Sequence, residues 1–159
     1  MNVEPFVKNY LSEHYGDDSF QTLAGYEAKG GFAGLRKALA QTPEQVVEIV
    51  KASGLRGRGG AGFATGLKWS FMPKTNERMK VIVVNGDESE PGSFKDRMIM
   101  ERGPFEVLEG IIIGAWAMGA SRAYIYVRGE YARAIRTLEA AVQELYGKKR
   151  LGKNTFGVK

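Results

Sequence analysis

The sequence contains no cysteine, and His14 is the single histidine among its 159 residues. The absence of cysteine excludes disulfide bonds, zinc–thiolate sites, iron–sulfur ligation and cysteine nucleophiles in this chain. With one histidine, a Ser-His-Asp triad or a metal site built from several histidines is excluded as well. His14 is interpreted as a surface residue, and no metal site built from cysteines or from several histidines is expected.

Long apolar runs are also missing. The longest, residues 111–118, is interrupted by Gly114 and is far shorter than the ~20 residues that a membrane-spanning helix needs. The first 18 residues are too acidic and too interrupted for a signal peptide. We therefore expect a soluble cytoplasmic domain without direct membrane insertion.

Basic residues outnumber acidic ones only at one end of the chain. The formal net charge is +5, yet residues 1–145 carry as many basic as acidic side chains, and the surplus lies within residues 146–159. A nucleic-acid-binding domain usually spreads its basic residues over one face of the folded body. Nucleic acid is therefore not an expected partner, although RNA binding through the basic end remains a third possibility, which would show a steep salt dependence.

Glycine is abundant instead. The chain has 21 glycines, about 13% of its residues and close to twice the usual ~7%. Neither repeats nor low-complexity segments account for them, and many fall into two short loops. We therefore expect the functional residues in those two loops.

The order of apolar patterns predicts an α/β fold. Residues 1–30 are polar and weakly patterned, which indicates a surface arm, and residues 31–159 form the expected domain. A helix is expected over 32–40, and a second begins at Thr42-Pro43-Glu44-Gln45, which resembles a capping box, and stops at Gly54. Further helices are expected over 63–72, 105–118 and 130–146, with strands over 81–84 and 123–127. Strands alternating with long helices indicate right-handed crossovers and a parallel sheet.

The two expected strands differ in pattern. Residues 81–84 are Val-Ile-Val-Val, a continuous β-branched run typical of a strand buried on both faces. In the second strand Tyr124 and Tyr126 alternate with Ile125, so we expect the tyrosines to pack on one face of the sheet.

The first glycine-rich loop, residues 54–62, contains Gly57-Arg58-Gly59-Gly60-Ala61-Gly62 and formally matches G-x-G-x-x-G. A dinucleotide fingerprint should follow a strand, whereas here a capped helix precedes it. Glycines still let backbone N–H groups approach an anion at the start of the next helix, and Arg56, Arg58 and Lys68 add positive charge. A tight helix–helix turn is the alternative, but four glycines in six positions exceed what a turn needs, which favours ligand binding.

The second loop, residues 85–92, reads Asn-Gly-Asp-Glu-Ser-Glu-Pro-Gly and follows the first strand at its carboxyl end. Ligands bind at that edge of open parallel sheets. In one interpretation Asp87, Glu88 and Glu90 are simply solvated; in the other, together with Asn85, they hydrogen-bond the hydroxyl groups of a ribose or ribitol. A basic glycine loop opposite an acidic, polyol-binding loop would suit a nucleotide cofactor.

Other residues could contact a ligand, but each also has a purely structural interpretation. Phe63, Trp69 and Phe71 are aromatic and could stack on a flat ring, but aromatics in a short helix usually belong to the core. Arg128-Gly129-Glu130 ends the second strand at the same sheet edge, where a helix cap is the simpler interpretation and a ligand contact the other.

Taken together, these segments resemble one family. Residues 53–63 and 65–74 resemble the flavin-binding loop of the FMN-bearing, NADH-oxidising subunit of respiratory complex I, and residues 85–97 resemble its second signature. Residues 125–131 and 151–154 resemble two further landmarks, so that the resemblance runs from about Gly30 to Asn154. Related subunits of NAD-dependent hydrogenases and formate dehydrogenases share these motifs. The resemblance implies a Rossmann-like, three-layer FMN-binding domain.

The resemblance also implies roles for individual residues. Those that match FMN-contacting positions are Gly57, Arg58, Gly59, Gly60, Lys68, Asn85, Asp87 and Glu88. Phe63, Phe71 and Glu90 match positions around NADH, the two rings against adenine and the carboxylate near a ribose. Three departures, Ala64 for proline, Val84 for cysteine and Gly86 for alanine, remove no ligand-contacting group.

Family members continue well beyond this length. They add a second flavin-contacting segment, a ubiquitin-like domain and a helical domain that ligates a 4Fe–4S cluster. The chain therefore resembles half a site, with a sheet that is incomplete at its C-terminal end. It fits a fragment, a split subunit or a truncated piece equally well.

The resemblance implies that the chain is the FMN-binding and NADH-oxidising portion of an NADH:quinone oxidoreductase. The cofactors would be FMN and NADH, with electrons passed to iron–sulfur clusters that other chains carry. Expected partners are other subunits on the cytoplasmic side of a membrane complex, including an iron–sulfur subunit and, as one alternative, a chain that supplies the missing half. The competing interpretations are a flavoprotein fragment of a hydrogenase or formate dehydrogenase, or a non-catalytic structural or assembly module.

We also expect the chain to prefer NADH over NADPH and to associate when isolated. The acids of the second loop should disfavour NADPH, whose 2′-phosphate adds negative charge. A sheet that ends within a domain exposes a strand edge and apolar surface, so the isolated chain should associate or need companion chains.

Overall fold

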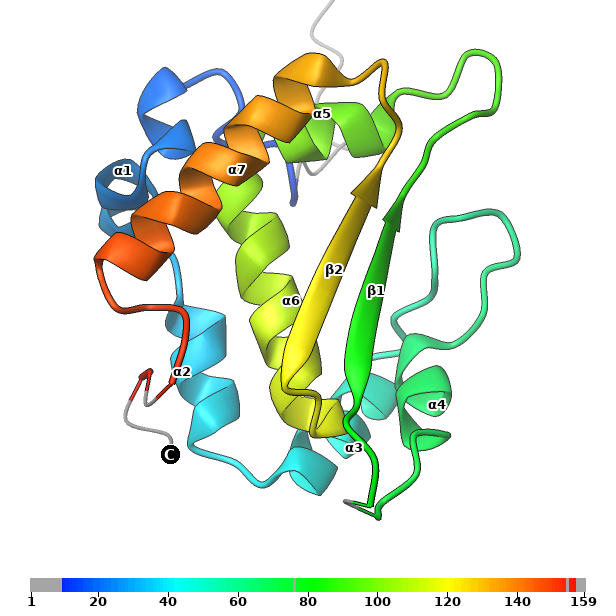
Figure 1. The fold of residues 1–159 in the computed structure, drawn as a ribbon. Helices are drawn as coiled ribbons and strands as arrows, with labels where there is room; N and C mark the ends of the chain where they lie inside the picture. The colour runs from blue at the N-terminus through cyan, green and yellow to red at the C-terminus, as the bar shows by residue number, and fades with distance from the viewer. Residues whose placement is uncertain (1–9, 76, 154, 157–159) are drawn as a thin grey trace, which may run out of the picture. The chain divides into compact units, whose positions relative to one another are not determined.

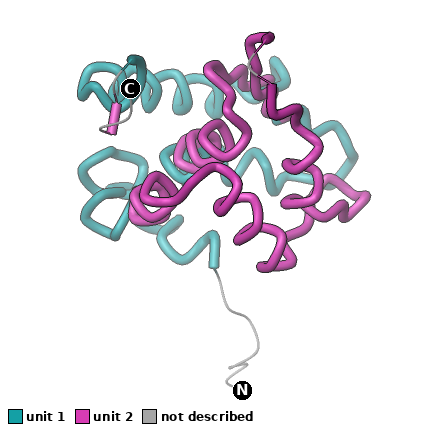
Figure 2. Tube along the Cα trace, turned by 90° about the horizontal axis from the view of Figure 1, so that it is seen from below, with its two compact units in different colours: residues 1–31, 86–107, 127–153 teal, residues 32–85, 108–126, 154–159 magenta. Residues whose placement is uncertain are grey.

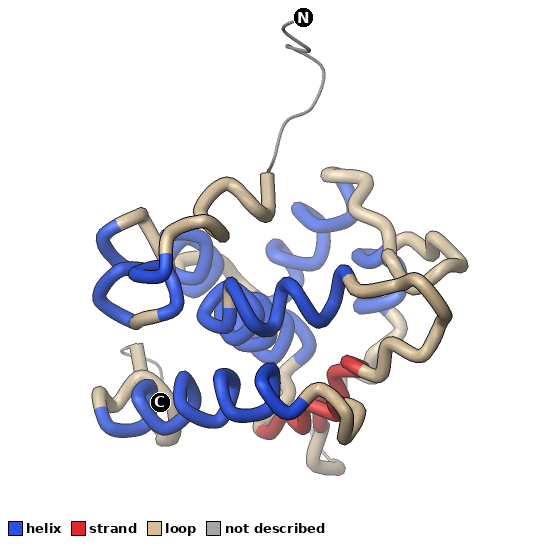
Figure 3. The backbone as a smooth tube through the Cα atoms, turned by 90° about the horizontal axis from the view of Figure 1, so that it is seen from above, coloured by secondary structure: helices blue, strands red, loops and turns tan. Residues whose placement is uncertain are grey.

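The computed structural model describes residues 10–75, 77–153, 155 and 156. A 3-10 helix, η1 (Asp18–Gln21), precedes four helices, α1 (Leu23–Ala28), α2 (Ala33–Leu39), α3 (Pro43–Ala52) and α4 (Thr65–Ser70). Strand β1 (Val81–Gly86), helices α5 (Lys95–Arg102) and α6 (Pro104–Met118), strand β2 (Arg122–Val127) and helix α7 (Ala132–Gly147) follow (Figure 1). The two strands form one small sheet, and Figure 3 colours strands, helices and loops along the chain. None of the helices described is long and apolar enough to cross a membrane.

The chain divides into two compact units, each made of separated segments (Figure 2). Unit 1 comprises residues 1–31, 86–107 and 127–153, and contains η1, α1, α5 and α7. Unit 2 comprises residues 32–85, 108–126 and 154–159, and contains α2, α3, α4 and almost all of the sheet.

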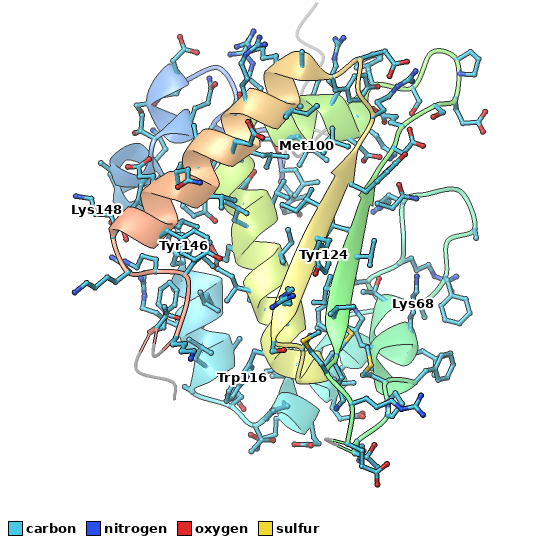
Figure 4. All side chains as sticks on the ribbon, in the orientation of Figure 1. Lys68, Met100, Trp116, Tyr124, Tyr146 and Lys148 are labelled. Atoms are coloured by element: carbon cyan, nitrogen blue, oxygen red, sulfur yellow. The ribbon has the colours of Figure 1, made fainter. Side chains whose placement is uncertain are left out.

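Unit 1 is held together by aromatic rings and by the apolar stripe of α7. The Phe20 and Tyr26 ring centroids lie 5.3 Å apart, and Tyr26 stacks on Phe105 at 5.9 Å. The stripe of α7 recurs every three or four residues, as a helix with one buried face requires. It consists of Ala134, Leu138, Ala141 and Leu145. Helix α5 packs against α7, and Met100 of α5 is buried (Figure 4).

The described part of the expected surface arm is folded, which corrects the sequence prediction for residues 10–30. Helices η1 and α1 bury Phe20, Leu23 and Tyr26. Each begins at a local side-chain cap, because Asp17 accepts from the Ser19 N–H and Thr22 accepts from the Gly25 N–H. A segment this short has no clear helical period, so the capped turns and buried rings were not apparent in the sequence pattern.

Unit 2 contains the sheet and the helices that cover one of its faces. β1 and β2 are neighbours and run in the same direction (Figure 1). An ideal Cβ on Gly114 of α6 would lie 3.6 Å from the side chains of both Ile82 and Trp69, so α6 packs closely on β1. The core beneath combines Ala38, Val46, Val47 and Ala117 with the partly buried Trp69, Ile113 and Trp116. The Trp116 ring N–H donates to the Gln41 carbonyl.

The sheet of this chain has one open face, which corrects the prediction that residues 81–84 are buried on both faces. Val83 is 67% exposed, whereas Ile82 points toward α6. Tyr124 and Tyr126 are more than half exposed, and Tyr124 projects from the face away from α6 (Figure 4). They alternate with the half-buried Ile125 as expected, but their face is not packed within the described residues.

Candidate functional site

The glycine loop, residues 54–62, is closed at its base by backbone hydrogen bonds. Arg56 and Ala64 form an isolated antiparallel bridge. The Gly57 N–H donates to the Phe63 carbonyl at 2.8 Å, and the Thr65 N–H donates to the Leu55 carbonyl at 2.9 Å. These contacts fix both ends of the loop and leave its glycine-rich tip exposed.

Besides Gly54 at its start, two glycines of this loop adopt backbone conformations that other residues rarely take. Gly60 has a φ of +113° and Gly62 a φ of +60°, so glycine is required there by conformation. Apart from the adjoining residues of the chain, no heavy atom of the residues described lies within 4 Å of an ideal Cβ at Gly59, Gly60 or Gly62. The space above the loop backbone is therefore open to a ligand.

A cleft of about 550 Å³ lies between this loop, α4 and β1. Its volume is within the range of small-molecule sites, about 300–1,000 Å³. Of the candidate site residues, Gly57, Gly59, Phe63 and Lys68 line the cleft. Trp69, Met72 and Val83 add apolar surface. Lys68 extends from α4 on the side of the glycine loop (Figure 4). The residues present thus fit a phosphorylated, flat cofactor.

Positive charge at the cleft is available to an anion. Lys68 and Arg58 are both exposed, and neither takes part in an ion pair among the described residues. Arg56 instead donates to the Gly62 carbonyl at 3.1 Å and stabilises the loop itself. Arg58, Gly60 and Phe71 do not line the cleft.

Phe63 and Phe71 form an exposed pair beside α4. Their ring centroids lie 6.2 Å apart in an edge-on arrangement, and 48% of Phe63 and 65% of Phe71 is exposed. Sequence reasoning from the residues alone favoured core positions for these rings, and the structure corrects that interpretation. Two exposed rings side by side offer a surface on which a planar base can stack.

The acidic loop, residues 85–92, contains acids in two different environments. Asn85, Asp87 and Glu90 are exposed, and the Asp87 carboxylate accepts from the Ser89 hydroxyl at 2.8 Å. Glu88 is only 5% exposed. Asp87, Glu88 and Glu90 belong to unit 1, whereas Asn85 lies near the end of β1 in unit 2.

Both carboxylate oxygens of Glu88 are used by protein donors. Oε1 accepts from the Ser93 hydroxyl and the Asp96 N–H, each at 3.0 Å. Oε2 accepts from the Arg97 N–H at 3.2 Å and the Tyr131 hydroxyl at 3.3 Å. Burial alone raises the pKa of the Glu88 carboxyl, but these hydrogen bonds to its ionised form together bring the pKa below its ordinary value. Glu88 is therefore held as a carboxylate at the start of α5.

Two side chains after β2 also contact the acidic loop, and the sequence did not assign them this role. Arg128 donates to the Glu88 carbonyl at 2.7 Å, and the Tyr131 hydroxyl lies 3.3 Å from the same oxygen. Arg128 also pairs with Glu130 at 3.2 Å. The available signal was position, because both residues follow the carboxyl end of a strand parallel to β1. Among the described side chains, no group of three or more His, Cys, Asp or Glu could hold a metal ion.

Comparison with known proteins identifies relatives that match most of this chain. A model of the Nuo51 FMN-binding domain matches residues 50–157. An NADH-quinone oxidoreductase subunit of Rhizobium meliloti is 54% identical over 85% of this chain and 32% of its own length. The corresponding NADH-quinone oxidoreductase subunit of Streptomyces coelicolor is 45% identical over 98% of this chain and 35% of its own length. The chain thus spans about one third of the curated relatives that it matches.

A solved structure also aligns with much of this chain. An NAD+-reducing NiFe-hydrogenase in the air-oxidized state aligns with 68% of this chain and 19% of its own, at 41% identity and a TM-score of 0.62. The resemblance expected from the sequence motifs and the Rossmann-like α/β class are both confirmed.

Proposed function

We propose, from the premise that the chain belongs to the Nuo51 FMN-binding domain family, that it binds FMN and NADH as part of a multi-subunit oxidoreductase. The single observation that carries this proposal is the cleft of about 550 Å³, where the glycine loop, Lys68 and Phe63 meet. Exposed backbone N–H groups and an available cation can bind the phosphate of FMN, and an aromatic ring offers a surface on which a flat ring can stack. We assign residues 31–159 as the nucleotide-binding part.

In this proposal the glycine loop and the cations bind the flavin. Backbone N–H groups and the positive charges of Arg58 and Lys68 neutralise the phosphate, and glycines at 57, 59 and 60 permit close approach. Asn85 and Asp87 hydrogen-bond polar groups of the flavin. FMN held there would supply a hydride acceptor for NADH and single-electron transfer to iron–sulfur clusters on other chains.

The remaining assignments concern NADH. Phe63 and Phe71 stack on the adenine, and Glu90 accepts a hydrogen bond from a ribose hydroxyl. To Glu88 we assign the role of holding the acidic loop and not a contact with a cofactor. Both of its carboxylate oxygens already accept hydrogen bonds from protein donors. No side chain of the chain is required as a general acid or base, since the cofactors carry the chemistry.

We further propose that the host is an NADH:quinone oxidoreductase on the cytoplasmic side of a membrane, with an iron–sulfur subunit as a neighbour. The names of the curated relatives support this choice. The likeness to an NAD+-reducing NiFe-hydrogenase favours a second candidate, a flavoprotein subunit of a hydrogenase. The electron acceptor distinguishes them: quinone reduction by the isolated complex supports the first, and hydrogen-dependent NAD+ reduction supports the second.

The FMN proposal is tested by titrating the purified chain with FMN and following flavin fluorescence. Lys68→Ala removes a charge-assisted contact worth about 1.5–3 kcal/mol, so we expect FMN affinity to fall roughly ten- to hundredfold. Lys148→Ala is the matched control, because Lys148 is exposed at the end of α7 (Figure 4). A wild-type chain that binds no FMN, alone or with the companion subunits, contradicts the proposal and favours a non-catalytic module.

A further inference from the structure

The contacts around Glu88 link three segments of unit 1. Its carboxylate joins the acidic loop to the start of α5 through the backbone N–H groups of Asp96 and Arg97. Its carbonyl joins the same loop to the residues after β2 through Arg128 and Tyr131. A single residue therefore fixes the loop by its side chain and by its backbone.

Arg128 and Tyr131 support each other as well as the loop. The Arg128 guanidinium lies over the Tyr131 ring, 5.4 Å from its centroid, and the Arg97 guanidinium lies 6.0 Å from the same ring. The Tyr131 hydroxyl reaches both the carbonyl and Oε2 of Glu88. Stacking on two guanidinium groups restricts the ring, so that its hydroxyl is directed at Glu88.

Anchoring of Glu88 also restricts the positions of the neighbouring acids, Asp87 and Glu90. Asp87 precedes Glu88, Glu90 follows two residues later, and both of these acids are exposed. Since the Glu88 backbone is anchored through its carbonyl, the chain can present Asp87 and Glu90 outward in one defined arrangement. Loss of the anchor would let these carboxylates sample several positions, which weakens any directional hydrogen bond to a ligand.

We propose that Arg128 and Tyr131 are positioning residues for nucleotide recognition, acting through Glu88 to hold the acidic loop so that Glu90 reads the ribose. This inference rests on the proposed function. It assigns no ligand contact to Arg128 or Tyr131. Their effect on the nucleotide is transmitted by the Glu88 carbonyl and carboxylate alone.

The test uses Tyr131→Phe in the full chain, because this change removes the hydroxyl and keeps the ring. Tyr146→Phe is the matched control, since Tyr146 lies on α7 and is exposed (Figure 4). Arg128→Gln removes the guanidinium, and Arg128→Lys restores a positive donor. Hydrogen exchange of residues 86–97 reports the order of the loop, and titrations with NADH and NADPH give the affinity ratio of the two nucleotides.

We expect faster exchange at the Asp96 and Arg97 amides in Tyr131→Phe and Arg128→Gln, with partial recovery in Arg128→Lys. The ratio of NADH to NADPH affinity should fall about three- to tenfold, the equivalent of one hydrogen bond. Tyr146→Phe should change neither quantity. A purely structural role would alter stability and exchange without altering this ratio.

Unchanged exchange in Tyr131→Phe overturns the inference, and so does faster exchange with an unchanged nucleotide ratio. Absence of NADH binding by the wild-type chain overturns it too. A wild-type chain that binds NADH but not FMN contradicts the proposed flavin function alone, because the nucleotide ratio and the exchange are measured without flavin.

Discussion

Two buried glutamates, Glu88 and Glu109, cap helices from a distance. Helix α2 has Phe32 at its N-cap and α5 has Phe94, and neither phenylalanine supplies a side-chain cap. Glu109 accepts from the N–H groups of Phe32 at 2.7 Å and Leu35 at 2.8 Å, as Glu88 does at α5. A carboxylate at a helix N-terminus satisfies backbone donors and interacts favourably with the helix dipole.

We expect Glu109→Gln to lower the free energy of unfolding by about 1–3 kcal/mol, because an amide N–H₂ then faces a backbone N–H in a buried position. Urea unfolding followed by circular dichroism measures the change. Glu139→Gln is the control, since Glu139 is exposed on α7. Equal stabilities for the two variants would contradict the capping role of Glu109.

The lowered pKa of Glu88 predicts a pH dependence of stability. The folded-state pKa lies below the ordinary value of 4.5, so the unfolded chain binds this proton more tightly. The stability from Glu88 is therefore fully present above pH 4.5 and is lost as pH falls through the folded-state pKa.

Glu88→Gln should accordingly be less stable than the wild-type chain near neutral pH, and the two free energies of unfolding should converge on acidification. Urea unfolding from about pH 7 down to about pH 3 follows this convergence. Free energies that differ by a constant amount across that range would show that Glu88 is not held as a carboxylate by the start of α5.

Glu90 is the acid whose charge we expect to act against NADPH. Like charges a few ångströms apart cost about 1–4 kcal/mol at an effective dielectric constant of ~20–80. Glu90→Gln should therefore raise NADPH affinity relative to NADH by roughly tenfold or more, measured by titration of both nucleotides. Glu139→Gln again serves as the control. An unchanged ratio in Glu90→Gln would mean that Glu90 does not read the ribose.

At the scale of elements, local signals in the sequence predicted what local interactions determine. The capping box is present as expected, with Thr42 accepting from the Gln45 N–H and Gln45 accepting from the Thr42 N–H. Gly54 ends the helix with a φ of +68°. Both strands and helices α2, α6 and α7 also lie where their patterns predicted.

The sequence did not predict α5, for a physical reason. Its cap comes from Glu88, seven residues before its first residue, and its burial comes from packing on α7. The sequence leaves the acids of the acidic loop either solvated or in contact with a ligand, and gives no sign that one of them, Glu88, caps a helix. Contacts between elements of this kind leave no periodic trace in the sequence.

Helices α3 and α4 approach closely at Gly66. An ideal Cβ on Gly66 would lie 2.4 Å from the Lys51 backbone nitrogen, so a side chain there forces the helices apart. We expect Gly66→Ala to destabilise the chain and, by displacing Lys68, to weaken FMN binding. Urea unfolding and flavin fluorescence measure these two effects.

Gly110→Ala is the matched control for this change. Gly110 also lies within a helix, and in the part of the chain that the structure describes no heavy atom beyond the backbone of that helix lies within 4 Å of its ideal Cβ. Alanine is favoured over glycine in a helix by about 1 kcal/mol, so Gly110→Ala should retain or increase stability. A Gly66→Ala chain as stable as Gly110→Ala would contradict the close approach of α3 and α4.

At the scale of the whole molecule, the sequence predicted one domain and the structure has two units that interleave along the chain. The glycine loop belongs to unit 2, and Asp87, Glu88 and Glu90 belong to unit 1. Interleaving of this kind follows from crossover connections, which return the chain to a unit it has left. Composition does not change at such crossings, so no boundary was visible in the sequence.

The open face of the sheet bears on how the chain behaves in solution. Val83, Tyr124 and Tyr126 are all more than half exposed there. Full burial of a large apolar side chain contributes about 1.5–3 kcal/mol. These three side chains are already a third to a half buried, so burying the remainder contributes only part of that value. Set against a cost of association of about 4–15 kcal/mol, this supports weak association.

We therefore expect the isolated chain to associate weakly, in a concentration-dependent manner, through this face. Sedimentation velocity over a range of concentrations should show a rising average mass. Val83→Thr combined with Tyr126→Thr should reduce it, because threonine is β-branched, which suits a strand, and carries less apolar area than either residue. Ile49→Thr is the control, since Ile49 is an exposed apolar residue on α3. A dispersed wild-type monomer at every concentration would contradict the expectation that this face needs a partner.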